Sequence, residues 1–339
     1  MIEEAALDER AWASALDGFG DGLRDVYFTP DYHALHRANG DGEPSCDWFQ
    51  RGAARLLVPG LRTAIPGGRG FDLQTCNGYG GPIAAGDDRA FLDEAWARWR
   101  SGAAARGVVA ALFRLHPLAD NARFLPSDAR VIDDRSTVFV ELAAGVDAAF
   151  AAADSRHRNM VSKARRAGVV AAWSAPGAWP DFERLYGEAM QRLAAPPSLR
   201  FGSAYFAALQ KNDWAELATI ADERGLCAAA VFLWGPRWAH YHLSARRGDA
   251  PNYATNVLLQ AALERAAERR LAGLHLGGGT TTSPDDPLLR FKRSLGGRLL
   301  QYRVALVVAD AAAYAALVAD WTRVAGRAPS WLLGYRQPR

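Results

Sequence analysis

Apolar and polar positions alternate along the chain in a way that predicts two successive sets of strands and helices. In the first set, apolar runs predict strands at residues 53–58 and 108–115. Between them, apolar positions at helical spacing predict a helix over residues 89–106. The second set predicts helices over residues 147–167, 181–193 and 256–270, and strands over residues 227–234, 238–245 and 274–276. The expected fold class is therefore α/β (α+β), with a central mixed β-sheet flanked by helices in each half.

A tight turn and a short small-residue stretch punctuate this pattern. Gly235-Pro236-Arg237 joins two aromatic-rich runs, and these residues supply the backbone angles of a hairpin turn. Leu142-Ala143-Ala144-Gly145 separates a predicted strand from a predicted helix. A chain of 339 residues exceeds the usual size of one hydrophobic core. We therefore expect two domains, at residues 1–147 and 148–310, and a C-terminal tail at 311–339 that packs back on them.

Composition narrows the class of protein. Half of the residues are hydrophobic and 23% are charged, which is a globular balance, and a net charge of +3 does not by itself indicate nucleic-acid binding. Cys46, Cys76 and Cys227 lie far apart without metal-ligand spacing, so reduced thiols and no metal are expected. The first ten residues are acidic, and no apolar run approaches the roughly 20 residues of a membrane span, so a cytoplasmic protein is expected.

A basic segment begins the second half of the chain. Five lysines and arginines and no acid lie between Arg156 and Arg166, and Gly168 follows where a helix would end. On a helical wheel, a narrow apolar stripe leaves these cations on the remaining surface. Two interpretations stay open: a solvated helix face, or a helix that faces the phosphates of a ligand.

A second predicted helix, near residues 288–296, carries a lysine at the edge of its apolar face. The wheel groups Leu288, Phe291 and Leu295, with Lys292 about 40° from Leu288, whereas Arg290 and Arg293 point away. Lys292 either extends its amine to water or holds a desolvated charge in a cleft, where its reactivity can be tuned. The wheel leaves both open.

Glycine-rich and histidine-containing stretches complete the candidate chemistry. Gly277, Gly278 and Gly279 directly follow a predicted strand and permit close approach of a ligand, although no P-loop pattern is present. Tyr79 lies in a second glycine-rich loop, at residues 78–82. This loop either lets the backbone approach a ligand or only connects two structural elements, and both interpretations fit equally well. Histidines such as His116 are more often structural than catalytic, and no Ser-His-Asp order can be proposed.

Several of these stretches, in this order, resemble the FemABX peptidyl aminoacyltransferases and related acetyltransferase-like domains of the GNAT superfamily. The resemblance runs over most of the chain. It rests on residues 28–32, 78–82, 113–117, 156–168, 241–244 and 275–279, followed by Phe291-Lys292.

This resemblance implies two GNAT-like domains in tandem, the second of which carries the transfer site. It also implies transfer of an amino acid from its tRNA ester to an amine of a peptide or cell-wall precursor, with no bound cofactor. The Phe-Lys pair that lines the family's transfer site corresponds to Phe291 and Lys292, which are the expected catalytic residues. The expected substrate-binding residues are Tyr79, Arg114, His116, Arg158, Arg200, Tyr205, Tyr241, His242, Gly277, Gly278 and Gly279.

Two other functions remain open. The first is an N-acyltransferase that uses acyl-CoA or an acyl carrier in polysaccharide or natural-product biosynthesis. Coenzyme A enzymes of the superfamily hold the diphosphate with helix-end amides, and here the corresponding loop, residues 246–256, contains Asp249 and Pro251. Both weaken such a cradle, because Asp249 repels the diphosphate and Pro251 lacks an amide hydrogen. The second is a non-catalytic binding protein, against which the placement of Lys292 argues.

Overall fold

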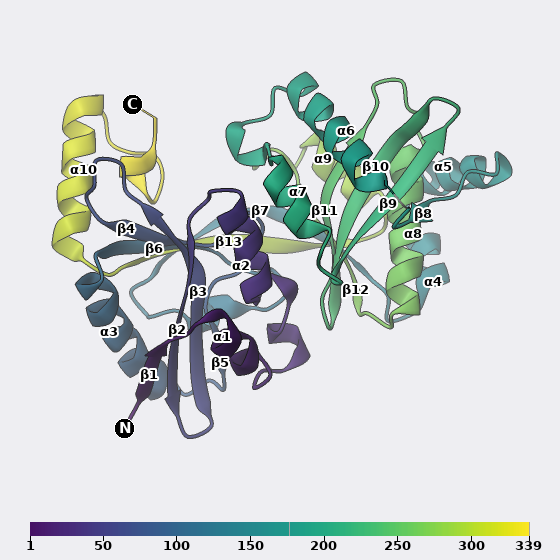
Figure 1. Ribbon diagram of the computed structural model, residues 1–339. Coiled ribbons are helices and arrows are strands. Elements are labelled where there is room, and N and C mark those ends of the chain that lie inside the picture. Colours follow the sequence, from purple (N-terminus) through teal and green to yellow (C-terminus); the bar gives the residue numbers. More distant parts are fainter. Residues whose placement is uncertain (176, 339) are drawn as a thin grey trace. The chain divides into compact units, whose positions relative to one another are not determined.

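The computed structural model describes residues 1–175 and 177–338, and Figure 1 gives the element labels. The chain forms two compact units. Unit 1 contains Met1–Asp134 and the chain from Tyr302 onward, and unit 2 contains Arg135–Gln301. The chain therefore leaves unit 1 after Asp134 and returns to it at Tyr302, so unit 1 is built from both ends of the sequence.

Unit 1 is a mixed sheet flanked by helices. Its elements are β1 (Glu3–Ala6), α1 (Glu9–Leu16), α2 (Pro30–Ala38), β2 (Glu43–Arg51), β3 (Ala54–Ala64), β4 (Phe71–Gln74), β5 (Ile83–Ala85), α3 (Arg89–Ala105), β6 (Val108–Arg114), the later part of β13 (Arg298–Val308) and α10 (Ala311–Ala325). The strands lie in the order β1-β2-β3-β4-β6-β13, with β5 on β3. Strands β4 and β6 are parallel to each other, and their connection contains β5 and α3.

Helix α3 begins where the sequence predicts because Asp88 caps it: its carboxylate accepts the Phe91 backbone N–H at 3.0 Å. One face of α3 is buried against the sheet of unit 1 (Figure 1), and its buried residues include Trp96 and Trp99. The C-terminal residues of the chain close another part of this unit. Tyr335 donates a hydrogen bond to the fully buried carboxylate of Asp72 at 2.6 Å, and Arg336 forms an ion pair with it.

Unit 2 has the same kind of layering. Its elements are the later part of β7 (Arg130–Glu141), α4 (Val146–Ala152), α5 (Ser155–Arg166), β8 (Ala172–Trp173), α6 (Ala178–Arg192), α7 (Ser203–Leu209), β9 (Ala215–Asp222), β10 (Gly225–Trp234), β11 (Trp238–Arg246), α8 (Ala254–Glu268), β12 (Gly273–Gly278), α9 (Pro287–Arg293) and the start of β13. The strands lie in the order β7-β12-β11-β10-β9-β8. Here β11 and β12 are the parallel pair, and α8 connects them.

The two sheets share one plan: an antiparallel run, a single parallel pair joined by a helix, and a last antiparallel strand. That last strand is β13 in unit 1, paired with β6, and β7 in unit 2, paired with β12. Unit 1 is thus completed by a strand from the C-terminal part of the chain, whereas the last strand of the unit 2 sheet is the first strand of that unit in sequence. The fold class predicted from the sequence, tandem GNAT-like domains with central mixed sheets, is confirmed. The expected domain limits at 147/148 and 310/311 differ from the limits of the compact units. That the two expected domains superpose on each other stays a prediction.

Most predicted elements are present, but one predicted helix is two. The expected helix at residues 147–167 breaks at Ala153 and Asp154, whose backbones are extended, into α4 and α5. Asp154-Ser155 favours a helix start over a helix interior, and the Asp154 backbone N–H donates to Ser294 O at 2.8 Å instead of to the preceding turn. Gly168 ends α5 with a φ of +70°, as predicted. Among the described residues, no helix has the length and apolar character needed to cross a membrane.

Candidate active site

Lys292 is the centre of the candidate site in unit 2. Its side chain is only 7% exposed, and its Nζ donates a hydrogen bond to Gly278 O, at the end of β12, at 2.7 Å. The ring of Tyr241 on β11 lies 5.7 Å from Nζ. This burial shows that the lysine does not extend its amine to water, while a role in catalysis stays a prediction.

The buried face of α9 differs from the predicted one. Leu289 and Lys292 are buried together with Leu295, whereas Leu288 is 37% exposed. The helix has only seven residues, so the wheel rests on few apolar positions, and its N-cap Asp286 holds the first turn. Phe291 is half-buried and packs against the hydrophobic core of unit 2.

The loop before α9 is organised by Asp286, which sequence reasoning missed as a site residue. One carboxylate oxygen accepts the backbone N–H groups of Leu288 and Leu289, at 2.9 and 3.0 Å, and so caps the helix. The other oxygen accepts the backbone N–H and the hydroxyl of both Thr280 and Thr281. The signal in the sequence is an aspartate directly before Pro287, since Asp is a preferred N-cap and Pro a preferred first helical residue.

Strands β11 and β12 separate beside Lys292. They are paired in parallel only from Trp238 with Gly273 to His240 with His275, although β11 continues to Arg246 and β12 to Gly278. The glycines expected to bind substrate, Gly277 and Gly278, thus lie on β12 beyond its pairing with β11. Such a split leaves strand edges beside a buried cation, an arrangement suited to a carbonyl group that enters between the strands.

Burial controls the charge of this site. Loss of water lowers the pKa of Lys292 from its usual 10.5 to about 8, and the Asp286 carboxylate opposes this shift. The pKa of Asp286 is itself held well below its usual range by the Leu289 backbone N–H and by Thr280 and Thr281. Near neutral pH the site therefore contains a mostly protonated amine whose charge is poorly shielded by water, which can stabilise a developing oxyanion strongly.

Other predicted residues of unit 2 lie on two faces of its sheet. Tyr241 packs on Phe232 and donates its hydroxyl to Ser244. His242, on the opposite face as the strand alternation predicts, shares a 2.7 Å hydrogen bond with Tyr205. Arg200 donates to Ala195 O at 2.8 Å. Substrate binding by these residues stays a prediction.

Arg158, expected to bind substrate, has a structural contact. Its guanidinium donates to Ala151 O at 3.0 Å and to Ala153 O, so it satisfies carbonyl groups at the end of α4. Arg165 forms an ion pair with Glu264 at 2.9 Å. Of the five cations of α5, Arg156, Lys163 and Arg166 are exposed and have no ion pair within the described part of the chain.

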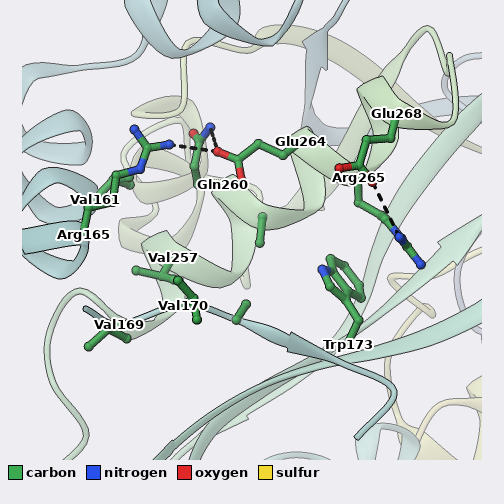
Figure 2. A pocket seen from close by; sticks show the side chains of 12 residues that line it. Val161, Arg165, Val169, Val170, Trp173, Val257, Gln260, Glu264, Arg265 and Glu268 are labelled. Atoms are coloured by element: carbon green, nitrogen blue, oxygen red, sulfur yellow. Dashed lines mark hydrogen bonds and ion pairs between the residues drawn. The ribbon is translucent and has the colours of Figure 1, made fainter. Parts of the chain in front are cut away.

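A groove of unit 2 runs beside the same helix, between α5, α8 and residues 169–173 (Figure 2). Its volume is about 220 Å³, and Trp173 and valines line it below the Arg165–Glu264 pair. None of the residues predicted to bind substrate or to catalyse transfer lines this groove. The groove and the candidate site around Lys292 are therefore distinct features of the unit.

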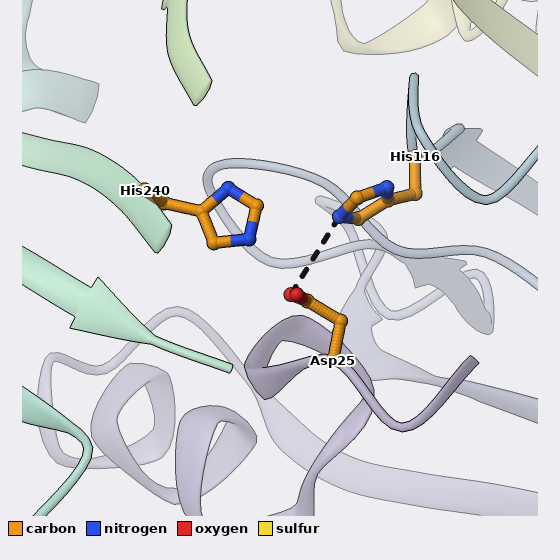
Figure 3. Close-up of side chains that lie close together, drawn as sticks. All are labelled: Asp25, His116 and His240. Carbon is orange, nitrogen blue, oxygen red and sulfur yellow. Dashed lines mark ion pairs between the residues drawn. The ribbon is translucent and has the colours of Figure 1, made fainter. Parts of the chain in front are cut away.

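The predicted residues of unit 1 gather around an aromatic cluster. The rings of Tyr79 and His116 are 5.8 Å apart, and Arg114 donates to Thr75 O at 2.9 Å. His116 Nδ1 accepts the Leu118 backbone N–H at 3.2 Å, so the proton of the neutral ring belongs on Nε2, which lies 3.6 Å from Asp25 (Figure 3). With Nδ1 occupied, His116 is better suited to holding this part of unit 1 together than to accepting a proton. Its role in substrate binding stays a prediction.

Comparisons with known proteins bear on the fold of the chain. Residues 154–293, which include Lys292, match the model of the acetyltransferase (GNAT) domain family. The crystal structure of FemX is similar over 89% of this chain and 96% of that chain, with 11% sequence identity and a TM-score of 0.70. The C-terminal domain of a putative lysylphosphatidylglycerol synthetase from Agrobacterium fabrum is 16% identical, over 91% of this chain and 97% of that chain, with a TM-score of 0.56. L-PGS from Bacillus licheniformis is 14% identical, over 81% of this chain and 91% of that chain, with a TM-score of 0.55.

The class of protein follows from these findings. Residues 154–293 match the acetyltransferase (GNAT) domain family, and the chain has a fold similar to that of FemX. The FemABX-like resemblance predicted from the sequence is thereby confirmed, with the likeness to solved structures establishing the fold. No curated protein matches the sequence of this chain.

Proposed function

We propose that this protein is an N-acyltransferase that joins an acyl group to an acceptor amine, and that Lys292 stabilises the oxyanion formed in this reaction. The observation that carries the proposal is a buried ammonium, 7% exposed, held by Gly278 O where β11 and β12 separate. Burying a charged amine is costly unless it is paired and hydrogen-bonded, and such perturbed groups cluster at functional sites. A carbonyl oxygen that becomes negative during acyl transfer is the partner that such a cation stabilises best.

The reaction follows from ordinary acyl-transfer chemistry. The neutral amine of the acceptor attacks the ester carbonyl carbon of the donor, a C–N bond forms, and the carbonyl oxygen takes the negative charge. Lys292 donates to this oxyanion. The intermediate then collapses as the ester C–O bond breaks, and the proton of the attacking nitrogen ends on the leaving oxygen. Phe291 is proposed to line the transfer site beside Lys292.

We propose aminoacyl-tRNA as the donor and an amine of a peptide or cell-wall precursor as the acceptor. The FemABX resemblance implies both. The loop that would hold a coenzyme A diphosphate also supports this choice, because Arg247 is already engaged by Asp222 and Asp249. Asp249 moreover places a carboxylate in this loop, ahead of α8. The exposed cations Arg156, Lys163 and Arg166 offer contacts for tRNA phosphates.

An acyl-CoA donor is the second candidate. The matching family model is that of an acetyltransferase domain, and it covers α8, β12 and α9, the elements around the site. In that case a thioester C–S bond would break in place of the ester C–O bond, while Lys292 would act on the same carbonyl oxygen.

The donor is decided by a direct assay. Purified protein is incubated with a panel of acceptor amines and either aminoacyl-tRNA charged with radiolabelled amino acids or radiolabelled acetyl-CoA, with Lys292→Met as the matched control. Amide product from tRNA alone supports the first donor, and product from acetyl-CoA alone supports the second. Product that forms equally well with Lys292→Met would refute the proposed role of Lys292.

A further inference from the structure

Asp286 connects the two supports of Lys292. It is 2% exposed, and its two carboxylate oxygens accept six hydrogen bonds from four residues. Two of these bonds hold the first turn of α9, the helix that carries Lys292. The other four hold Thr280 and Thr281, which directly follow Gly278 and Gly279. Gly278 O in turn accepts the bond from Lys292 Nζ.

A carboxylate fits this position because it accepts all six hydrogen bonds, four of them from backbone N–H groups that can only donate. An asparagine retains one acceptor oxygen, but its NH₂ group would face the donors of Thr280 and Thr281. Gly279 shows how closely the loop approaches Asp286: a Cβ atom at Gly279 would lie 2.4 Å from the Asp286 carboxylate oxygen Oδ1. Such dense satisfaction of one buried group exceeds what a helix of seven residues needs for its cap.

We infer that Asp286 is a positioning residue for acyl transfer: it fastens the loop after β12 to the start of α9 and thereby presents Lys292 Nζ at the separation of β11 and β12. The inference rests on the proposed function of Lys292. Asp286 does not touch the reacting atoms, and it acts through the lysine.

The electrostatic surroundings make this inference testable apart from activity. Among the described residues, Asp286 faces Lys292 from the cap of α9, and Tyr241, whose pKa is raised by burial, faces it from β11. Asp286 is the negative one, so its removal should lower the pKa of Lys292 further. This pKa reports the electrostatic contact between Asp286 and Lys292, while kcat reports the positioning of Lys292.

The test compares Asp286→Asn with a matched cap variant, Asp310→Asn. Asparagine caps helices about as well as aspartate, so α9 should still begin at Pro287. Asp310 caps α10 of unit 1 through the Ala313 backbone N–H at 2.9 Å, and its replacement should affect only local stability. Thr281→Val, which removes a single hydroxyl donor to Asp286, is the milder variant should Asp286→Asn fold poorly.

Two readouts are used. Steady-state kinetics should give a kcat about 10- to 100-fold lower for Asp286→Asn, with a nearly unchanged KM, because misplacement of a reacting group slows the chemical step. Cyanate reacts with neutral amines, so the pH dependence of carbamylation at Lys292, followed by mass spectrometry of its peptide, reports its pKa without any substrate. The midpoint should lie near pH 8 in the wild type and lower in Asp286→Asn.

The outcomes separate the two proposals. If Lys292→Met is fully active, the proposed function fails, while the carbamylation midpoints still report on Asp286. If Asp286→Asn keeps both the wild-type kcat and the wild-type midpoint, or if Asp310→Asn loses as much activity, the positioning role is refuted. Thr281→Val keeps the Asp286 carboxylate, so it should lower kcat by less than Asp286→Asn and leave the carbamylation midpoint near that of the wild type. A wild-type kcat in Thr281→Val would count against the inference.

Discussion

The amine of Lys292 lies in a buried environment that disfavours its charged form. Burial lowers its pKa to about 8, and Asp286 prevents a larger fall. Complete loss of the charge would remove the ability to stabilise an oxyanion, whereas a fully solvated ammonium would be screened by water. The observed balance leaves the amine mostly protonated at neutral pH and still poorly shielded.

Replacing Lys292 by methionine tests this directly. Lys292→Met keeps the shape and the stem of the side chain, so the fold and donor binding should persist, while turnover should fall by about 10² to 10³, the usual cost of removing one oxyanion donor. Arg290→Met and Arg293→Met serve as controls, because both side chains are exposed on the same helix. Equal losses of kcat at all three positions would show that Lys292 contributes only to a general positive charge of the surface and has no specific role in catalysis.

The pH dependence of activity and stability should reflect the same group. Activity that needs the protonated amine should fall as the pH rises through about 8. Stability should move the other way: the folded pKa lies below the usual 10.5, so the unfolded chain binds more protons between these values. The free energy of unfolding of the wild type, relative to Lys292→Met, should therefore rise with pH in that window. Urea titrations at pH 7 to 10.5 measure the difference, and a flat profile would contradict the low pKa.

Individual residues of the site were only partly predictable. The order of short motifs identified Phe291 and Lys292 through a family resemblance, but the helical wheel placed Leu288 on the buried face. The wheel assumes that apolar residues orient a helix, whereas Asp286 holds the first turn of α9 by two hydrogen bonds and the preceding loop by four. Those bonds join residues that a periodicity argument treats as a polar loop, so the role of Asp286 required coordinates.

At the scale of elements, two of the five cations of α5 form contacts with other parts of unit 2. Arg158 holds carbonyl groups of α4, and Arg165 is paired with Glu264 across to α8. Removing Arg158 should therefore cost stability, which makes it a poor probe of ligand binding. The cations Arg156, Lys163 and Arg166 are the better candidates for phosphate contacts.

Replacing these three cations by alanine should weaken tRNA binding and leave stability nearly unchanged, since exposed charges contribute little to folding. The slope of log affinity against log salt should decrease by about one for each phosphate that the variant no longer neutralises. Filter-binding titrations at several salt concentrations measure both quantities. A matched triple variant, Arg10, Lys211 and Arg270 to alanine, removes the same charge from exposed positions elsewhere. Equal effects of the two triples would favour the interpretation of α5 as a solvated face.

Local patterns predicted elements better than their connections. The hairpin around Gly235-Pro236-Arg237 and the helix capped by Asp88 are encoded within a few residues, and both are present. The break between α4 and α5 was missed because an apolar stripe runs through it, while the competing contact of Asp154 is with Ser294, far along the chain. Long-range competition of this kind leaves no periodic signal.

At the scale of the whole molecule, the exchange of last strands explains why a boundary near residue 147 looked natural. Strand β7 follows β6 in sequence, so it appears to finish the first domain, but residues 137–141 pair with β12 of unit 2. Likewise β13 follows β12 and pairs with β6 of unit 1. Strand patterns show where strands are, and they do not show which sheet receives them.

The exchange predicts how fragments should behave. Unit 2 is continuous in sequence, so a fragment of residues 135–301 contains every strand of its sheet and should fold cooperatively by itself. A fragment of residues 1–134 lacks the β13 residues that pair with β6, and it leaves the buried carboxylate of Asp72 without Tyr335 and Arg336. An unpaired buried charge costs about 3 to 5 kcal/mol, which is a large part of the stability of an ordinary domain. This fragment should be unfolded or aggregate.

Urea unfolding followed by circular dichroism decides the point, with a fragment of residues 148–310 as the comparison. That fragment lacks β7, so the outer edge of β12, next to the strand end that supports Lys292, has no partner. It should unfold at lower urea than residues 135–301, because an open edge loses ladder hydrogen bonds and exposes apolar side chains such as Leu274 and Leu276. If residues 148–310 and 1–147 each fold as stably as the fragments drawn from the compact units, the exchanged strands contribute little, and the boundary near residue 147 describes the domains better.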